Sequence, residues 1–249
     1  MYKGFYTLSS SMLTQNRKLN VISNNLSNVS TPGYKSDELV SGTFKEGLLS
    51  RTSNNTLGAR GESLGNTSMI TVPYETVTDF SGGSLEDTGG ILDFAIVGDG
   101  FFKVQSDNGP VYTRNGSFMI DDKGYLSLKG VGRVLSNNNP IFLPTDNINV
   151  ESDGTITDGN GVQIAKLNVV EFDSIDGLKK TGKGVFSATG QEKVANTNLM
   201  WKYVETSNVD TISEMTAMLA SQRTLQSAAQ VLKIYDEISA KAANEIGKV

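Results

Sequence analysis

The final stretch of the chain places the strongest constraint on its fold. From Asp210 to Ile246 there is neither proline nor glycine. Apolar and small residues recur there at alternating steps of three and four, the spacing of a coiled-coil seam, at Met218, Ser221, Leu225, Ala228, Leu232, Tyr235, Ser239, Ala242 and Ile246. Two further stripes lie beside this seam, namely Ile212, Met215, Leu219, Gln222, Gln226 and Ala229, and Val231, Ile234 and Ile238. Because one partner covers only one side of a helix, we expect a helix about 55 Å long that is surrounded by other helices.

The first thirty residues show a similar pattern. Apolar residues step by four and three, with a polar interruption at Gln15, along Phe5, Leu8, Met12, Leu19, Ile22, Leu26 and Val29. The pattern stops at Thr31-Pro32-Gly33, where proline removes a backbone donor and favours an extended Thr31. Asparagine and serine crowd the second half of this segment and compete with helical hydrogen bonds. We therefore expect either a helix that is marginal alone and folds on assembly, or an ordinary helix with a frayed end.

Composition excludes several classes of function. The 249 residues suffice for one or two domains, and the formal net charge of −5 offers no nucleic-acid footprint. No apolar run is long enough for membrane insertion, and the N-terminus lacks the apolar region of a cleaved secretion signal. Cysteine and histidine are absent, which removes disulfides, sulfur or imidazole zinc sites, and Ser-His or Cys-His pairs. We expect no metal and no cofactor.

The middle of the chain is typical of β structure. Residues 31–80 are rich in Gly, Ser, Thr and Asn and predict an extended connector with a few edge strands. Further on, short apolar runs alternate with Asn-Gly and Asp-Gly turns, which indicates antiparallel hairpins. The expected strands lie at 91–97, 101–104, 111–114, 117–120, 125–128, 148–150 and 162–172.

These patterns together predict an α+β fold. Long N- and C-terminal helices, residues 1–30 and 207–249, pair as a discontinuous coiled-coil domain. An extended β connector spans 31–80, and a central antiparallel all-β domain spans 81–206. Ser207 can cap the final helix, with Asp210 three residues on, where negative charge favours a helix N-terminus. The alternative is a small antiparallel helix pair that closes a single globular domain.

No catalytic constellation is evident. Gly98-Asp99-Gly100 lacks the following helix of a phosphate-binding loop, so a turn is favoured. Asp153-Gly154 and Asp158-Gly159 lack the alternating ligands and closing glutamate of a calcium loop. The adjacent carboxylates at 121–122 and 236–237 project in different directions. We expect a protein that is not an enzyme, without a small-molecule substrate.

Several stretches, in the N-terminal, central and C-terminal parts of the chain, resemble one family. Residues 24–35 (NNLSNVSTPGYK) resemble the N-terminal signature of bacterial flagellar basal-body rod and hook proteins. Residues 97–104 and 112–118 resemble the central β region of that family, and 205–210 with Arg223 resemble the start of its C-terminal helix. The residues that carry the resemblance are Asn24, Asn25, Leu26, Asn28, Thr31, Pro32, Gly33, Gly98, Gly100, Phe101, Phe102, Thr113, Arg114, Gly116, Ser117, Phe118, Ser207, Asn208, Val209 and Arg223.

The resemblance implies a structural role in motility. It implies a rod subunit, proximal or distal, that self-assembles helically into the hollow drive shaft that transmits torque. The implied partners are copies of the chain, other rod and hook proteins, and the flagellar type III export apparatus. The implied location is the flagellar basal body in the cell envelope. Two other readings remain open, a monomeric β-domain adhesin or binding module with a helical stalk, and a carboxylate-dependent glycan hydrolase.

Overall fold

The computed structural model describes residues 2–43, 46–51, 62–68, 70–144, 147–182, 184–188, 190–195 and 198–246. The chain falls into two compact units. Unit 1 contains residues 1–26, 37–77 and 211–249, and unit 2 contains residues 27–36 and 78–210. Parts of the expected connector, at 44–45, 52–61 and 69, lie outside the described residues.

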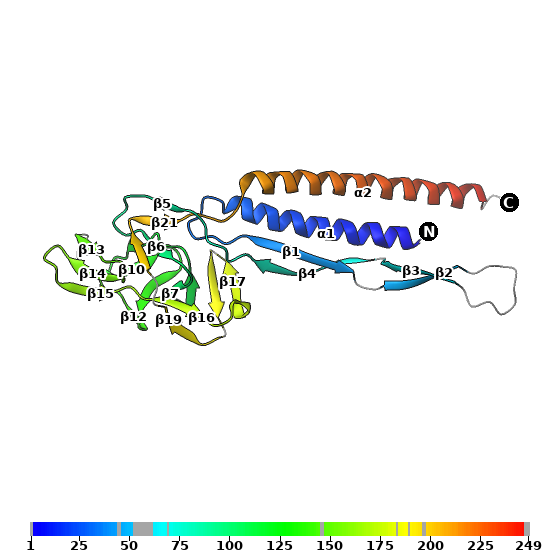
Figure 1. Ribbon diagram of the computed structural model, residues 1–249. Coiled ribbons are helices and arrows are strands. Elements are labelled where there is room, and N and C mark those ends of the chain that lie inside the picture. The colour runs from blue at the N-terminus through cyan, green and yellow to red at the C-terminus, as the bar shows by residue number, and fades with distance from the viewer. Residues whose placement is uncertain are drawn as a thin grey trace. The chain divides into compact units, whose positions relative to one another are not determined.

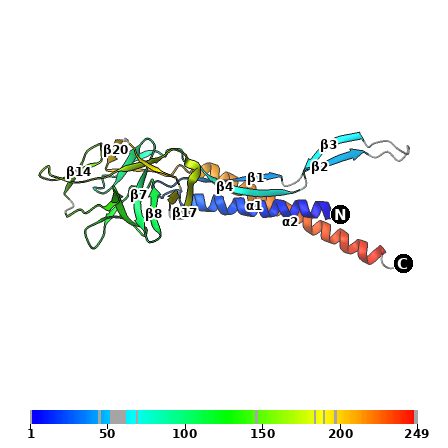
Figure 2. The ribbon, with the colours of Figure 1, turned by 90° about the horizontal axis from the view of Figure 1, so that it is seen from below.

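Unit 1 consists of two helices and two β ribbons. Helix α1 (Tyr2–Ser27) has 26 residues and helix α2 (Thr211–Ile246) has 36. Strand β1 (Asp37–Thr43) pairs with β4 (Thr71–Thr78), and β2 (Glu46–Arg51) pairs antiparallel with β3 (Glu62–Ser68). Strands β1 and β4 run in opposite directions along α1 (Figures 1 and 2). The predicted terminal helices and edge strands are thus present.

The limits of both helices follow from local chemistry. Helix α1 ends at Ser27, and the chain turns ahead of Pro32, as the proline predicts. Helix α2 begins at Thr211, later than expected, because Ser207 Oγ instead accepts the amide of Val209 in the segment before the helix. Glu214 places a negative charge in the first turn, where the helix dipole favours it. Within the described residues, no helix combines the length and hydropathy that crossing a membrane needs.

Unit 2 is a β domain built mainly of short antiparallel strands. Its strands are β5 (Leu85–Asp87), β6 (Phe94–Val97), β7 (Phe101–Ser106), β8 (Gly109–Thr113), β9 (Met119–Ile120), β10 (Leu126–Leu128), β11 (Gly132–Ser136), β12 (Asn139–Pro140), β13 (Ile148–Val150), β14 (Thr155–Asp158), β15 (Gln163–Lys166), β16 (Val169–Phe172), β17 (Leu178–Gly182), β18 (Val185–Ala188), β19 (Glu192–Val194), β20 (Asn198–Trp201) and β21 (Tyr203–Glu205). A short 3₁₀ helix (Ile175–Gly177) precedes β17.

Strand β7 is central to the largest sheet. The order of that sheet is β17-β18-β8-β7-β11-β10-β9, with β12 on β11, β16 on β7 and β19 on β16. Smaller groups are β13-β14-β15, β20-β6 and β21-β5. Successive side chains of a strand point to opposite faces, and both faces of β7 are buried. Phe102 and Val104 enter the main core, whereas Phe101 enters a second aromatic cluster.

One expected strand is in fact two. The run 162–172 divides into β15 and β16, which belong to different sheets. Between them, Leu167 is 1% exposed and donates its amide to the carbonyl of Gly154 at 2.7 Å. Burial of this leucine turns the chain from one sheet to the next, which an uninterrupted apolar run does not reveal.

The turn at Gly116 is packed so closely against the core that it has no room for a side chain. A Cβ atom on Gly116 would lie 1.7 Å from the carbonyl oxygen of Phe94 and 3.1 Å from the ring of Phe102. The backbone of Gly116 in turn accepts the amide of Phe94 at 3.0 Å. The Asn-Gly turn therefore fixes how closely β6 approaches the segment before β9.

We predict that Gly116→Ala lowers the free energy of unfolding of unit 2 by at least about 2 kcal/mol, because backbone must move to admit the methyl group. Urea denaturation of the full chain measures the loss. Gly82→Ala is the matched control, since a Cβ there meets no atom within 4 Å. Equal effects of the two substitutions would contradict the packing argument.

Candidate functional site

The two helices of unit 1 lie antiparallel and in contact. Asn25 Nδ2 donates to Glu214 Oε1 at 2.7 Å, near the end of α1 and the start of α2. At the other end of α1, a Cβ on Gly4 would lie 2.7 Å from Tyr235 Oη. Ile22 and Ser221 are each 4% exposed. Because Gly4 carries only a hydrogen, Tyr235 of α2 can approach α1 closely there.

The structure places the residues of the expected seam as follows. Ile22 is buried, and the partly covered members are Leu8, Met12, Leu19, Leu26, Val29, Met218, Leu225, Leu232 and Tyr235. Phe5 is 50% exposed, because Gly4 takes the position opposite Tyr235. A helix of 3.6 residues per turn drifts relative to a strict heptad, which shifts the contact by one residue at this end. The side chain of Ile246 lies outside the described residues.

Helix α1 is covered on a second side by the β1–β4 ribbon. Thr14 Oγ1 donates to the carbonyl of Thr71 in β4 at 3.3 Å. Asn25 donates to the carbonyl of Asp37 in β1 at 2.8 Å and accepts its amide at 3.0 Å. Asn25 is 1% exposed, so one side chain fastens α1 to both β1 and α2.

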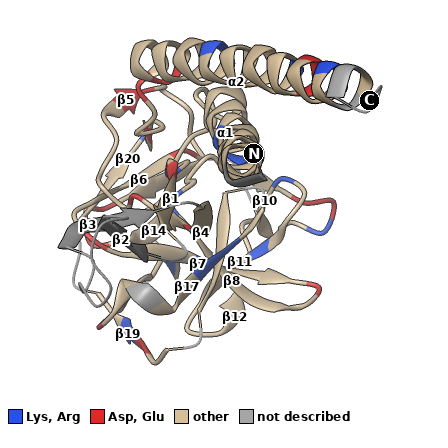
Figure 3. Ribbon diagram, turned by 90° about the vertical axis from the view of Figure 1, so that its right-hand side faces the viewer, with Lys and Arg blue, Asp and Glu red and all other residues tan. Residues whose placement is uncertain are grey.

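Helix α2, by contrast, leaves two apolar stripes exposed. Ile212, Met215 and Leu219 are 78%, 50% and 57% exposed. Ile234 and Ile238 are 53% and 54% exposed, and Val231 is 39% exposed. At 100° per residue, these two stripes lie on opposite flanks of the covered face. Charged residues occur at intervals along α2 (Figure 3), and the two apolar stripes lie among them and among exposed uncharged polar residues.

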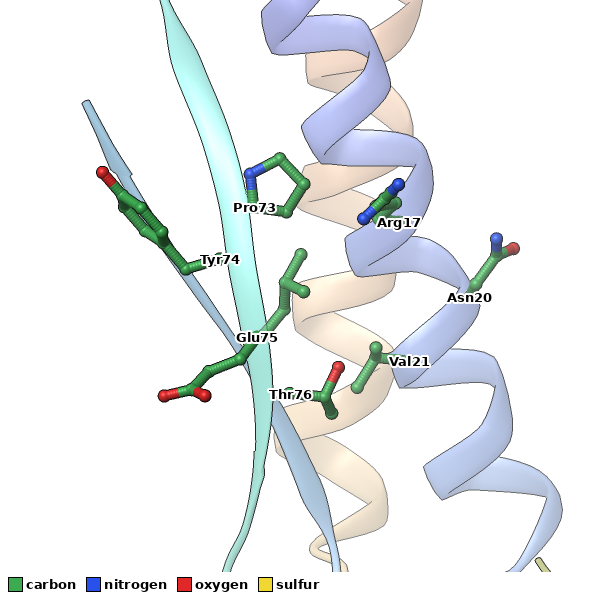
Figure 4. Close-up of a pocket in the computed structure, with 8 residues that line it drawn as sticks. Arg17, Asn20, Val21, Pro73, Tyr74, Glu75 and Thr76 are labelled. Atoms are coloured by element: carbon green, nitrogen blue, oxygen red, sulfur yellow. The ribbon is translucent and has the colours of Figure 1, made fainter. Parts of the chain in front are cut away.

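A small open groove lies between α1 and the β1–β4 ribbon. Its volume is about 320 Å³, and its lining residues are Arg17, Asn20, Val21, Leu39, Pro73, Tyr74, Glu75 and Thr76. Pro73 and Thr76 point toward α1, whereas Tyr74 and Glu75 point away from it (Figure 4). The lining is mixed in polarity and does not converge polar groups on one point as a catalytic pocket does.

Unit 2 contains a buried ionic cluster, here called the Glu205 network (Lys35, Gly83, Arg114 and Glu205). Glu205 Oε1 accepts the Lys35 ammonium at 2.6 Å and the Gly83 amide at 2.9 Å. Glu205 Oε2 accepts Arg114 Nη1 at 3.4 Å. The Lys35 and Glu205 side chains are only 1% and 3% exposed. Lys35 Nζ also donates to the carbonyl of Ser81 at 2.6 Å.

Burial and charge act in opposite directions on the cations of this network. Burial lowers the pKa of Lys35 below its ordinary value, while the hydrogen bond and negative charge of Glu205 oppose that shift. Burial likewise lowers the pKa of Arg114, and the charges of Glu205 and Asp99 oppose it. Glu205 is therefore the group that makes burial of two cations tolerable.

Residues of the three motifs meet around this network. Gly33 donates its amide to the Glu205 carbonyl at 2.7 Å, and a Cβ on Gly33 would lie 2.3 Å from the Arg114 backbone. The φ of Gly33 is +64°, which favours glycine. The buried motif residues are Asn25, Gly33, Gly100, Phe101, Phe102, Thr113, Arg114, Gly116, Phe118 and Val209. The half-buried ones are Leu26, Asn28, Thr31, Pro32, Ser207 and Asn208, and the exposed ones are Asn24, Gly98, Ser117 and Arg223.

Lys35 and Glu205 lie within the stretches that resemble the family, but their pairing was not predicted from the sequence. Lys35 and Glu205 are 170 positions apart, so no local period relates them. One signal for this pairing was available in the sequence. Lys35 ends the N-terminal motif, Glu205 begins the C-terminal motif, and the two side chains carry opposite charge. Thr14 was also missed, since a threonine between apolar positions gives no sign of a contact to β4.

The fold and the helix surfaces define a class of protein. It is an α+β protein with one unit in which the terminal helices contact each other and α2 leaves apolar stripes exposed, and a second unit that is a β domain. Three family models match this chain: “Flagella basal body rod protein” over residues 5–35, “Flagellar hook protein FlgE/F/G D1 domain” over 95–158, and “Flagellar basal body rod FlgEFG protein C-terminal” over 202–245.

Curated relatives agree along the whole length. The flagellar hook-basal body complex protein FlhO of Bacillus subtilis (strain 168) is 30% identical, with 100% of both chains covered. The flagellar basal-body rod protein FlgG of the same strain is 31% identical, with 98% of this chain and 99% of the relative covered. FlgF of Caulobacter vibrioides is 26% identical, with both chains fully covered. The chain belongs to the flagellar basal-body rod protein family.

We predict that Asn25→Ala lowers the free energy of unfolding of unit 1 by about 2 kcal/mol, because the buried amide and carbonyl of Asp37 lose their partner. Thermal loss of helical circular dichroism in the full chain measures the effect. Asn16→Ala, on an exposed position of the same helix, is the control and should change stability by less than about 0.5 kcal/mol. A neutral Asn25→Ala would show that α1 does not depend on this side chain.

Proposed function

We propose that this chain is a structural subunit of the flagellar basal-body rod. It assembles helically with copies of itself and with other rod and hook proteins, and the resulting hollow shaft transmits torque. Its relatives carry the names of flagellar basal-body rod and hook-basal body proteins. The role is structural and needs no catalytic group.

The uncovered apolar surface of α2 carries this proposal. Its two exposed stripes lie on opposite flanks of the face that meets α1, and the helix α1 adds exposed Tyr6 and Leu13. Apolar surface of this extent in water favours association with other chains. Burying apolar surface on more than one flank of α2 requires more than one neighbouring subunit. A subunit within a tube has several such neighbours.

The arrangement of these stripes suits an open helical assembly. A two-fold dimer buries the same patch on both copies and satisfies one flank. Two different stripes on one helix instead permit contacts between unlike surfaces, which generate a filament when the rotation between subunits does not close. We propose that α1 and α2, within segments 1–30 and 207–249, form the assembly domain and pair there as a coiled coil.

The cellular route follows from the same proposal. A subunit of this rod must reach the cell envelope, and we propose export through the flagellar type III apparatus. The Asn- and Ser-rich second half of α1 has weak intrinsic helix stability, which is compatible with passage as an extended chain. The destination is the basal body, where the rod crosses the periplasm.

We predict that Ile234→Asp prevents incorporation into the rod while it leaves the folding of the isolated chain unchanged. Ile234 is 53% exposed, so a carboxylate there is solvated in the monomer, but burying it against a neighbouring subunit carries a cost of several kcal/mol. The test is motility, together with immunoelectron microscopy of purified basal bodies from cells whose only copy of the chain is the variant.

Two further variants make this test specific. Lys233→Asp changes charge at the adjacent exposed position and should retain motility. Leu225→Asp lies on the partly covered seam and should reduce both helix stability and motility. Normal swimming by the Ile234→Asp strain would show that the exposed stripe is not an assembly surface. If the wild-type chain is absent from basal bodies, the rod function itself is wrong, and a surface binding module becomes the better hypothesis.

A further inference from the structure

The chain passes between its two units at four places, after residues 26, 36, 77 and 210. Three segments of unit 2 adjoin these passages, namely 27–36, the residues just after 77, and the residues just before 211. In a chain with flexible connections, these segments need not touch. In this protein all three meet in the interior of unit 2, around the Glu205 network.

Backbone hydrogen bonds join the first and last of these segments. The Gly33 amide donates to the carbonyl of Glu205 at 2.7 Å, and the Asn208 amide donates to the carbonyl of Tyr34 at 3.4 Å. Asn208 Oδ1 accepts the amide of Ser36 at 2.7 Å. The segment that leaves α1 is therefore held directly against the segment that leads into α2.

The middle segment is bound into the same place. The Asp79 amide donates to the carbonyl of Ser36 at 2.8 Å, and the Thr206 amide donates to the carbonyl of Ser84 at 2.8 Å. The Asn208 side chain also donates to the carbonyl of Asp79 at 2.9 Å. The Glu205 carboxylate, in the last segment, also joins all three segments: it forms an ion pair with Lys35 of the first segment and accepts the Gly83 amide of the second.

The body of the β domain holds these segments from outside. Arg114, in the turn after β8, donates to the Glu205 carboxylate. Lys180 in β17 donates to the carbonyl of Lys35 at 2.7 Å, and its ammonium lies 3.8 Å from the centre of the Tyr34 ring. Tyr34 is itself 2% exposed. The three segments are thus fixed to unit 2 as well as to one another.

We infer that the Glu205 network is a preformed clamp, which holds the end of the α1 segment against the start of the α2 segment before the helices pair. Ser27 and Thr211 are separated by roughly 180 residues, and closing a flexible loop of that length has an entropic cost that grows with the logarithm of its length. A clamp formed by folding of unit 2 alone removes that cost. The helices then need only associate outward from the Asn25–Glu214 end.

Hydrogen exchange of the monomeric full-length chain tests the clamp, independently of any rod. The informative amides are those of Gly33, Ser36, Asp79, Gly83, Thr206 and Asn208, which bind within or between the three segments. In the wild-type chain we expect all six to be protected. In Glu205→Gln, which keeps the shape but removes the negative charge, we expect all six to exchange at least about tenfold faster, as one group.

Asn208→Ala is a second variant that leaves every buried charge paired. It removes the side-chain bonds to Ser36, Asp79 and Ser81, and we expect the same six amides to exchange faster, by a smaller factor. Asp153→Asn is the control, because it breaks an exposed ion pair to Lys166 and should leave the six amides unchanged. The amides of the core strands β7 and β8 report whether unit 2 remains folded in each variant.

Three results would overturn the inference. Unprotected amides in the wild-type monomer would mean that no clamp exists before assembly. Acceleration confined to Gly83 in Glu205→Gln would mean that the carboxylate holds one amide rather than three segments. Equal acceleration in β7 and β8 in both variants would mean that the network supports unit 2 as a whole and has no separate role at the passages.

Discussion

Burial of the Glu205 carboxylate is the constraint on which the arrangement of unit 2 depends. The residue is 2% exposed, and an unpaired carboxylate at that depth would cost several kcal/mol. Its partners Lys35 and Arg114 lie 170 and 91 positions away in the sequence. The chain satisfies the charge only when the segments that contain Lys35 and Glu205 and the turn after β8 come together, so this interaction specifies which distant segments are neighbours.

Unit 1 is organised by the opposite condition. Asn25 makes several of the polar contacts that join its elements. Apolar surface on α2 remains exposed on both flanks of the face that α1 covers. Unit 2 thus pairs the buried Glu205 carboxylate with cations of its own chain, whereas unit 1 leaves the apolar stripes of α2 exposed. This division matches a subunit with a self-sufficient β domain and helices committed to assembly.

Much of the helical part could be predicted from sequence, because helical periodicity is local. The partly covered residues of α2 follow the predicted spacing from Met218 to Tyr235, and the exposed stripes are those that one partner cannot cover. The Glu205 network could not be predicted in this way, since nothing near Lys35 or Glu205 indicates a partner so far along the chain. The division of 162–172 into two strands was not predicted for a related reason: an apolar run indicates burial but not the sheet to which each half belongs.

The unequal lengths of the two helices have a consequence for growth. Tyr235 lies opposite Gly4, near the beginning of α1, so the last turns of α2 extend past the end of their partner. Ile238 in this overhang is 54% exposed. A single chain cannot cover it, and the first contact between two free chains covers only part of the apolar surface of each. In the helical assembly proposed above, an existing end that presents several subunits would cover more of this surface than one free chain does, so addition to that end would be favoured over pairing of two free chains. Elongation of the proposed assembly would thereby depend on a template that is already in place.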